Sequence, residues 1–441
     1  MRYIPNIPDD RRAMLAEIGL DSVDRLFDDI PQAVKDRFRP TGLAPRSEME
    51  VSQILHELAL LNRREVESVS FLGGGLYDHY IPSVVSHVAS RSEFYTAYTP
   101  YQPEISQGTL TAMFEFQTLV CELFGMDVAN ASLYDGATAV AEAALMAVRV
   151  AGTKRIAVAR SVFGHFRRVL RTYSWAAGIE VIEVPFAASG RLDRSAIPTG
   201  IAGLVTQSPN ALGVIEDLDG LKAQLGDALL VVAAHPLSLA VLASPGEFGA
   251  DVVVGEGQPL GLPASFGGPL LGLFATRDRY LRQMPGRIAG RTVDADGREG
   301  YTMAVATREQ HIRRERATSN ICTNSALCAL TATVYLAALG SEGLRELALL
   351  NLGKAHYLAE KLAALPGHAL AFDGPFFNEF VLRVPSDPRR IRTRLQDEGF
   401  LVEDPEPLVE LGLVRALRLA VTEKRSKEEL DLFVRILGGL R

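Results

Sequence analysis

The chain has 441 residues, of which 47% are hydrophobic and 22% charged, and its formal net charge is −7. This balance is typical of a soluble globular protein of two or three domains, and the acidic charge argues against nucleic acid or an anionic membrane surface as a partner. We expect neither a secretory signal nor an apolar run of the roughly 20 residues that cross a bilayer. Three cysteines without metal-ligand spacing predict a cytoplasmic protein with no metal site.

Lysine is rare in this chain. Only seven of the 46 basic residues are lysines, and none lies between residues 223 and 353. Lysine chemistry in the middle of the chain is therefore excluded.

The first 65 residues are predicted to form a helical arm. Apolar residues recur at helical spacing in DDRRAMLAEIGL, in DSVDRLFDDIP and over residues 48–64. Such an arm either wraps a partner subunit or packs on its own chain, and the sequence leaves both open.

Two unusual loops follow the arm. The glycine loop, residues 73–80, begins with three consecutive glycines, which indicates a close backbone approach or an unusual turn. The tyrosine loop, residues 94–108, is broken by prolines and is a candidate binding surface. Internal packing of its tyrosines is the alternative. Its candidate site residues are Tyr95, Tyr98, Tyr101, Gln102 and Glu104.

A helix predicted over residues 132–152 begins with small residues, namely Asp135, Gly136, Ala137 and Thr138. Free amides and the helix dipole at such a start favour an anion, so phosphate binding is one interpretation. Simple N-capping by Asp135 is the other.

Strands and helices then alternate, which predicts an α/β domain over residues 66–320 with a mostly parallel sheet. In such sheets, sites lie beyond the carboxyl ends of the strands. The loops after Pro209, His235 and Glu256 are therefore the expected site. The last of these belongs to the stretch 251–268, a valine-rich strand followed by a turn rich in glycine and proline.

Residues 321–441 are predicted to form a small α+β domain. Its last helix should begin at the capping box Ser426–Glu429. The arginine-rich segment 308–320 before this domain is either a solvated helix face or a contact for an anionic group.

The order of these parts resembles the fold-type-I enzymes of the aspartate aminotransferase class, which use pyridoxal phosphate. Longer strings are similar to the glycine cleavage system P-protein, and more closely to subunit 1 (alpha) of its two-subunit form. The similarity covers nearly the whole chain. The strings are YTPYQPEISQG, NASLYDGATAVAEA, LGLPASFGGP, PGRIAGRTVD, REQHIRRERATSNICTN and GPFFNEF.

The resemblance implies a reaction and its partners. P-proteins are glycine dehydrogenases that decarboxylate glycine through pyridoxal phosphate, which acts as electron sink, and pass the aminomethyl group to the lipoyl arm of the H-protein. It further implies pairing with subunit 2 (beta), most simply as an α2β2 heterotetramer.

The same resemblance implies that this chain is not catalytic. Pro259 falls where active relatives carry the cofactor-binding lysine, and Ala233 and Ala234 fall near the carboxylate that faces the pyridine nitrogen. The start at Asp135–Thr138 and a ring-stacking position at His165 are implied remnants. Pyridoxal phosphate is therefore expected on the partner, with no covalent cofactor here.

By fold analogy, the tyrosine loop and the glycine loop should face the partner's active site. One alternative is a scaffold or regulatory protein with no role in that site. The other is an autonomous pyridoxal-phosphate enzyme that uses Lys222 or Lys354, although both fall in helical patterns far from the turn.

Overall fold

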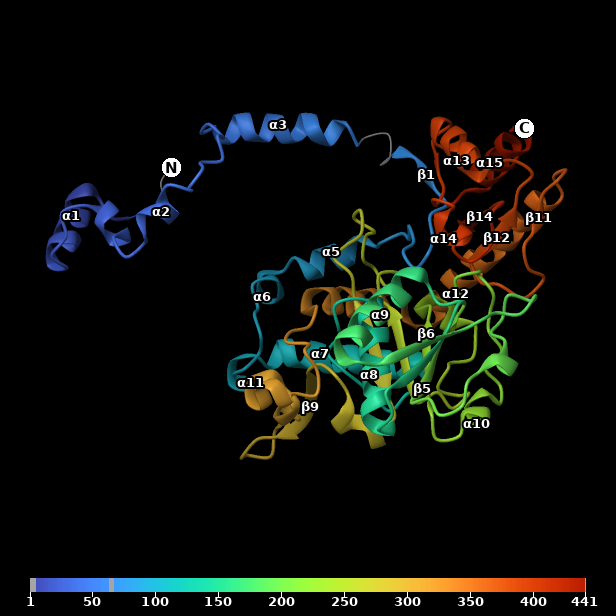
Figure 1. The fold of residues 1–441 in the computed structure, drawn as a ribbon, viewed down its shortest axis with the longest axis horizontal. Coiled ribbons are helices and arrows are strands. Elements are labelled where there is room, and N and C mark those ends of the chain that lie inside the picture. The colour runs from blue at the N-terminus through green and yellow to red at the C-terminus, as the bar shows by residue number, and fades with distance from the viewer. Residues whose placement is uncertain (1–4, 63–66, 441) are drawn as a thin grey trace. The chain divides into compact units, whose positions relative to one another are not determined.

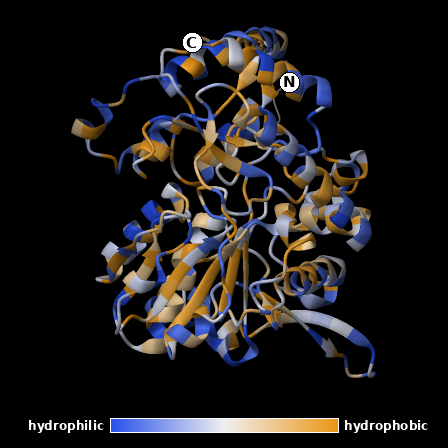
Figure 2. Ribbon diagram, turned by 90° about the vertical axis from the view of Figure 1, so that its right-hand side faces the viewer, coloured by the Kyte–Doolittle hydropathy of each residue, from blue (hydrophilic) through white to orange (hydrophobic). Residues whose placement is uncertain are grey.

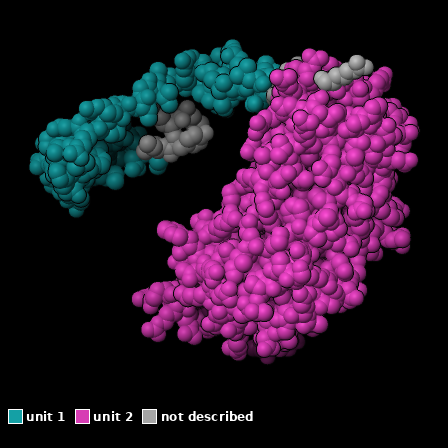
Figure 3. Space-filling view, turned by 45° about the vertical axis from the view of Figure 1, so that its right-hand side comes forward, with its two compact units in different colours: residues 1–63 teal, residues 64–441 magenta. Residues whose placement is uncertain are grey.

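The computed structural model describes residues 5–62 and 67–440. Contacts divide the chain into two compact units, residues 1–63 and residues 64–441, which Figure 3 shows in different colours.

The first unit consists of short helices: α1 (Pro8–Glu17), η1 (Val23–Phe27), α2 (Gln32–Lys35) and α3 (Glu48–Leu60). The segment DSVDRLFDDIP forms the five-residue 3-10 helix η1 rather than an α-helix, a tighter form that occurs in short pieces. The predicted end of the third helix at residue 64, and the arm boundary at residue 65, lie outside the described residues. Among the described residues of this unit only Leu15 is a buried apolar side chain.

The second unit is built on a seven-stranded sheet. Its strands are β2 (Val128–Ala129), β3 (Arg155–Ala159), β4 (Glu180–Val184), β5 (Gly203–Ser208), β6 (Leu229–Ala234), β7 (Val252–Glu256) and β8 (Gly272–Thr276). Their order is β2-β8-β7-β6-β5-β3-β4, with β3 to β7 parallel and β8 antiparallel to β7 and β2. Figure 2 shows predominantly hydrophobic strands between helices, as expected for strands buried on both faces. The predicted mostly parallel sheet is confirmed.

Helix α8 (Gly136–Ala151) packs across β5, β6, β7 and β8 (Figure 1). Small residues on the helix and the strand permit a close approach. A Cβ added at Gly203 of β5 would lie only 3.1 Å from the Cβ of Ala147 on α8. The other helices of this region are α7 (Gln107–Phe124), α9 (Gly164–Ala177) and α10 (Leu221–Leu225).

A second core lies around a three-stranded antiparallel sheet in the order β11 (Ala369–Leu370), β12 (Glu379–Arg383), β14 (Ala416–Ala420). Helices α13 (Pro388–Asp397) and α15 (Lys427–Gly439) accompany it, and α15 begins at the predicted capping box of Ser426. Phe71 packs in this second core, because β1 (Val69–Ser70) pairs with β13 (Phe400–Leu401). The proposed boundary at residue 320 stays a prediction.

Helix α12 (Ala326–Ala363) joins the two cores and is kinked at Gly340. Tyr335 is buried in the large core and Leu358 in the second core. Among the described helices, α12 alone is long and apolar enough to cross a membrane by length and composition. Core helices of folded proteins pass the same test, and the buried residues of α12 pack in the two cores of this unit.

Strands β9 (Ile288–Val293) and β10 (Glu299–Ala304) form a hairpin that the sequence did not predict. In the sequence it follows β8 and precedes α12. The remaining short elements are α5 (Ser83–Ala89), α6 (Ser92–Tyr95), η2 (Pro103–Ile105), η3 (Arg194–Ala196), η4 (Pro236–Ala240), η5 (Asp278–Gln283), η6 (Ala306–Arg308), α11 (Gln310–Arg313), η7 (Arg314–Arg316) and α14 (Glu406–Val409).

Candidate functional site

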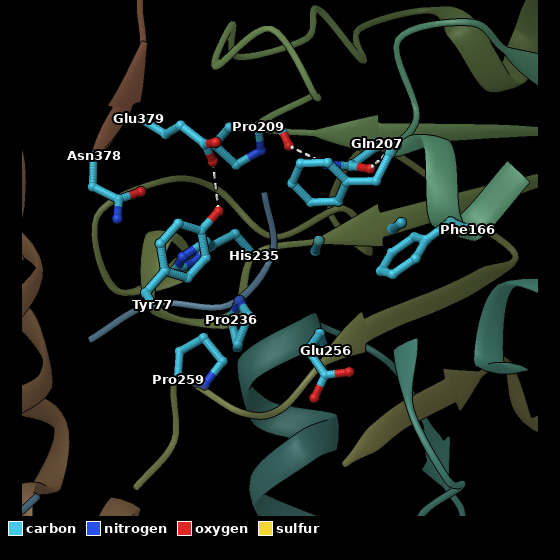
Figure 4. A pocket seen from close by; sticks show the side chains of 14 residues that line it. Tyr77, Phe166, Gln207, Pro209, His235, Pro236, Glu256, Pro259, Asn378 and Glu379 are labelled. Carbon is cyan, nitrogen blue, oxygen red and sulfur yellow. Dashed lines mark hydrogen bonds between the residues drawn. The ribbon is translucent and has the colours of Figure 1, made fainter. Parts of the chain in front are cut away.

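A small pocket lies at the carboxyl ends of β5, β6 and β7 (Figure 4). This is the predicted position, because Pro209, His235 and Glu256 all line it. Its free volume is about 30 Å³, which is room for about two water molecules. The other lining residues are Gly75, Tyr77, Phe163, Phe166, Gln207, Ala233, Ala234, Pro236, Pro259, Asn378 and Glu379.

Pro259 is buried and faces this pocket from the turn after β7. Ala233 and Ala234 line it at the end of β6. At the two positions where the resemblance implies a lysine and a carboxylate, the pocket therefore offers neither an amine nor an acid.

Glu256, the last residue of β7, directs its carboxylate to the start of α8. Its Oε2 accepts a hydrogen bond from Gly136 N at 2.9 Å, and its Oε1 accepts from Gln258 N and Leu271 N at 3.0 Å each. The residue is only 7% exposed. Burial raises the pKa of the carboxyl to about 7, although the three amide donors oppose this shift.

The start of α8 is capped from within. Thr138 N donates to Asp135 Oδ1 at 2.7 Å, and Asp135 N donates to Thr138 Oγ1 at 3.2 Å. Of the two interpretations left open for this start, the structure shows N-capping by Asp135. Because Gly136 N donates to Glu256 as well, the amides of Gly136 and Thr138 are both engaged, and Ala137 between them is buried.

Beside the pocket, Arg418 of β14 lies between two carboxylates. Its Nε is 2.9 Å from Glu379 Oε1, and its Nε and Nη2 both donate to Glu403. Burial opposes the charge of Arg418, but Glu403 and Glu379 outweigh burial and raise its pKa above the ordinary value. Glu379 also accepts from Gly74 N at 2.9 Å and from the Tyr77 hydroxyl at 2.7 Å.

The glycine loop lies against this chain's own pocket. Gly75 and Tyr77 line the pocket, and Tyr77 is only 3% exposed. Position 74 requires a glycine, because its φ is +74° and an added Cβ would lie 2.8 Å from Arg418 Nη2. Gly75 and Tyr77 turn inward, whereas Tyr80 is 62% exposed, and a position of this loop at the partner's site stays a prediction.

Two pocket residues carry polar atoms without a partner in the described part of the chain. Asn378 is 2% exposed and its Nδ2 makes no hydrogen bond, and both ring nitrogens of His235 are unpaired. Burial, and then nearby His79, lower the pKa of His235 to about 3, so its ring is neutral. These residues add hydrogen-bonding capacity to the pocket but no charge.

His165 is exposed on α9 and stacks on Phe163, with ring centroids 5.5 Å apart. Phe163 and Phe166 line the pocket, whereas His165 is not among its lining residues. The rings that face the cavity are therefore those of Phe163 and Phe166, on either side of the predicted position His165 in the chain.

The tyrosine loop lies apart from this pocket, and none of its candidate residues lines it. Tyr95, Tyr98 and Tyr101 are 67%, 82% and 57% exposed, so internal packing of these rings is not what the structure shows. The Tyr101 hydroxyl accepts a hydrogen bond from Arg287 Nη2 at 3.2 Å. Two further candidates are also exposed, Gln102 and Glu104.

The end of the tyrosine loop is anchored on the hairpin. Gln107 Nε2 donates to Tyr301 O at 2.9 Å, and Tyr301 N donates to Gln107 Oε1 at 2.8 Å. The loop therefore has a fixed base with exposed aromatic side chains.

The arginine-rich segment 308–320 divides into two kinds of residue. Arg308 is 7% exposed and donates to backbone carbonyls, including Gly286 O at 2.9 Å. Arg313 and Arg316 are exposed. The segment thus combines one structural arginine with a solvated face.

Neither candidate lysine of the autonomous enzyme reaches the pocket. Lys222 Nζ lies 2.9 Å from Asp251 Oδ2, which precedes β7 and is therefore at the opposite end of the strand. Lys354 donates to the backbone oxygen of Glu423. Over residues 5–62 and 67–440 no group of three or more His, Cys, Asp or Glu residues could hold a metal ion.

The residues around this pocket do not fit pyridoxal phosphate. Glu256 takes the amide of Gly136 that a phosphate would use, and the free volume of about 30 Å³ is far below what the cofactor ring requires. Pro259 supplies no amine.

Sequence patterns did not single out three residues that shape the site, which are Asn378, Glu379 and Arg418. Each is a polar group in an otherwise apolar strand, as in NEFVL and ALRLA, and that interruption is the signal that could have found them.

Comparisons with known proteins agree over the whole chain. A "Probable glycine dehydrogenase (decarboxylating) subunit 1" from Desulfitobacterium hafniense is 48% identical, with 100% of both chains covered. A crystal structure of glycine decarboxylase (P-protein) of the glycine cleavage system, in inhibitor-bound form, is 42% identical with a TM-score of 0.92 and covers 99% of both chains.

The predicted fold-type-I fold is confirmed by a wider set of structures. A sphingosine-1-phosphate lyase from Burkholderia pseudomallei is only 15% identical but has a TM-score of 0.66, covering 93% of this chain and 94% of its own. The sequence profile of the glycine cleavage system P-protein matches residues 1–437. With this match and the full-length relatives, the chain belongs to the glycine cleavage system P-protein family.

Proposed function

We propose that this chain is the non-catalytic subunit 1 of glycine dehydrogenase (decarboxylating) in the glycine cleavage system. The observation that carries the proposal is a pocket with Pro259 where the resemblance implies the lysine and with Glu256 bonded to the start of α8, in a chain 48% identical to a relative named as subunit 1. The name "subunit 1" supports a second, lysine-bearing subunit 2.

In this proposal the complex decarboxylates glycine with pyridoxal phosphate held by subunit 2. The cofactor supplies the electron sink for the decarboxylation. The aminomethyl group then passes to the lipoyl group of the H-protein. This chain contributes shape and contacts to the partner's site and no covalent chemistry.

An α2β2 heterotetramer is the simplest assembly. Fold-type-I pairs are obligate, and such interfaces bury on the order of 2,000 Å² or more with an apolar centre. Exposed apolar side chains of the first unit support an interface there, including Ile54, Leu55 and Leu58. We propose a cytoplasmic complex with no nucleic-acid or membrane partner.

The tyrosine loop is the part of this chain that we assign to the partner's active site. Its exposed rings at Tyr95, Tyr98 and Tyr101 support this role, as does the fixed base at Gln107. The neighbouring Gln102 and Glu104 supply further exposed polar groups.

Exchange of labelled bicarbonate into glycine tests the proposal. The chain is co-expressed with a homologous lysine-bearing chain and assayed with lipoylated H-protein, beside each chain alone. We expect exchange only from the pair. A full rate from subunit 2 alone would leave this chain as a scaffold, and exchange by this chain alone would make it an autonomous enzyme.

Size-exclusion chromatography with light scattering tests the assembly. The co-expressed chains should migrate as one species with the mass of two copies of each. Two separately migrating species at micromolar concentration would contradict the heterotetramer.

A further inference from the structure

Helix α8 has a start that is suited to an anion. It has 16 residues, and its first turn is made of small residues whose amides point out of the helix. In this structure the group that meets that start is a carboxylate of the same chain, because Gly136 N donates to Glu256 Oε2 at 2.9 Å.

The Glu256 carboxylate also fixes the turn after β7. Its other oxygen accepts from Gln258 N and Leu271 N, so three buried amides converge on one side chain. Gln258 continues the network, since its Oε1 accepts from Tyr77 N at 2.8 Å and its Nε2 donates to Leu262 O at 2.7 Å. One carboxylate thus links α8, the turn and the glycine loop.

The helix start and β7 are also in direct contact. A Cβ added at Gly136 would lie 3.0 Å from Glu256 N and 2.9 Å from the Cζ of Phe166. The strand end and the first turn of α8 are therefore closely packed at Gly136.

Arg418, the cation beside the pocket, is also paired with carboxylates of this chain. Arg418 is 5% exposed and its guanidinium is held by Glu379 and Glu403. The two groups best suited to an anionic ligand, the start of α8 and Arg418, therefore each carry carboxylates from this chain.

We propose that the Glu256 carboxyl group occupies the phosphate position of this pocket, holds β7 against α8, and closes the pocket to phosphate-bearing ligands. The proposal concerns this chain's own pocket and does not depend on the activity of the complex.

Thermal unfolding of the full-length chain in increasing inorganic phosphate tests this role. Glu256→Ala frees the amides of Gly136, Gln258 and Leu271, so its Tm should fall, since unpaired buried donors destabilise the fold. Phosphate should then raise that Tm in a saturable manner, by about 2 °C or more beyond the rise seen in the wild type.

Asp251→Ala is the matched control. Asp251 is the buried carboxylate at the other end of β7, where it accepts from Leu230 N at 2.9 Å. Its loss should lower the Tm without opening the helix start, so phosphate should raise its Tm only by the general effect of an excluded salt. Glu256→Gln keeps the side-chain volume and should likewise show no specific rise.

Hydrogen exchange of the wild-type chain decides the question even if Glu256→Ala does not fold. The segment 134–138 should be protected without phosphate and unchanged with it, because Gly136 and Thr138 already have partners. Phosphate-dependent protection of that segment, or an equal phosphate response in the wild type and all three variants, would overturn the proposal.

Discussion

At the scale of single residues, the pocket lacks three features that the family resemblance implies for a cofactor site. Pro259 offers no amine, Ala233 and Ala234 leave no acid at the end of β6, and Glu256 bonds to the helix start. Because these features act on different parts of a cofactor, restoring any one of them leaves the others missing.

Glu256 should make the stability of the chain depend on pH. Its pKa of about 7 in the folded chain lies above the ordinary value of 4.5, chiefly because it is buried. Between these pH values the unfolded chain releases the proton and the folded chain keeps it, so the free energy of unfolding falls as pH rises. The full effect is about 3 kcal/mol.

Denaturant unfolding of the wild type and Glu256→Gln at several pH values between about 5 and 8 measures this effect. The glutamine variant lacks this titration, so the wild-type free energy minus that of the variant should decrease across the range. Asp135, the charged neighbour of Glu256, is present in both proteins and cancels in the difference. A difference that stays constant with pH would contradict the assignment.

Restoring the lysine should not restore catalysis. Pro259→Lys places an amine in a pocket that still lacks an acid at Ala233 and Ala234 and still holds Glu256 at the helix start. The test pairs this variant with a subunit 2 whose own lysine is alanine. Bicarbonate exchange should remain at background, and clear exchange would show that the other two differences do not matter.

At the scale of elements, the kink of α12 rests on one glycine. Gly340 has φ 63° and ψ −177°, a conformation that only glycine adopts readily. Gly340→Ala should therefore destabilise the chain by about 1–3 kcal/mol, although an added Cβ would meet no atom within 4 Å.

Gly353 in the same helix is the matched control for this prediction. It is exposed, is not at the kink, and has open space for a Cβ. Gly353→Ala should stabilise the chain by about 0.5–1 kcal/mol. Equal effects of the two alanines in chemical denaturation would mean that the kink imposes no backbone requirement.

The tyrosine loop should affect the partner's catalysis through Tyr98. This ring is 82% exposed, and its hydroxyl has no hydrogen-bond partner within the described residues. Tyr98→Phe should reduce the exchange rate of the complex by roughly five- to 150-fold, equivalent to about 1–3 kcal/mol for a lost hydroxyl contact. Assembly should be unchanged.

Tyr357→Phe provides the control for that experiment. It also removes one hydroxyl, but the lost bond is to Asp431 within the second unit. Its exchange rate should match the wild type. A wild-type rate for Tyr98→Phe as well would mean that the Tyr98 hydroxyl has no role in the partner's site.

At the scale of the whole molecule, local patterns predicted the elements better than the contacts between them. The strand ends at Pro209, His235 and Glu256 were predictable because parallel strands present their carboxyl ends at one edge. The capping box of Ser426 was predictable because it spans four residues.

The internal closure of the pocket was not predictable in this way. Gly136 and Glu256 are 120 residues apart, and Tyr77 and Glu379 are 302 residues apart. No periodicity or spacing reports such a pairing, because it depends on how distant strands and loops meet in three dimensions. The β9–β10 hairpin was missed for a related reason, since only two of its twelve strand residues are buried and its strands lack a continuous apolar face.

The central claim is that this chain takes part in the complex without holding its cofactor. Borohydride reduction of the reconstituted complex, followed by peptide mapping, tests it most directly. All the reduced pyridoxal phosphate should be on the lysine-bearing partner, and none on any peptide of this chain from residues 223 to 353, which contain no lysine. A stoichiometric cofactor adduct on this chain, from Lys222, Lys354 or any other residue, would contradict the account.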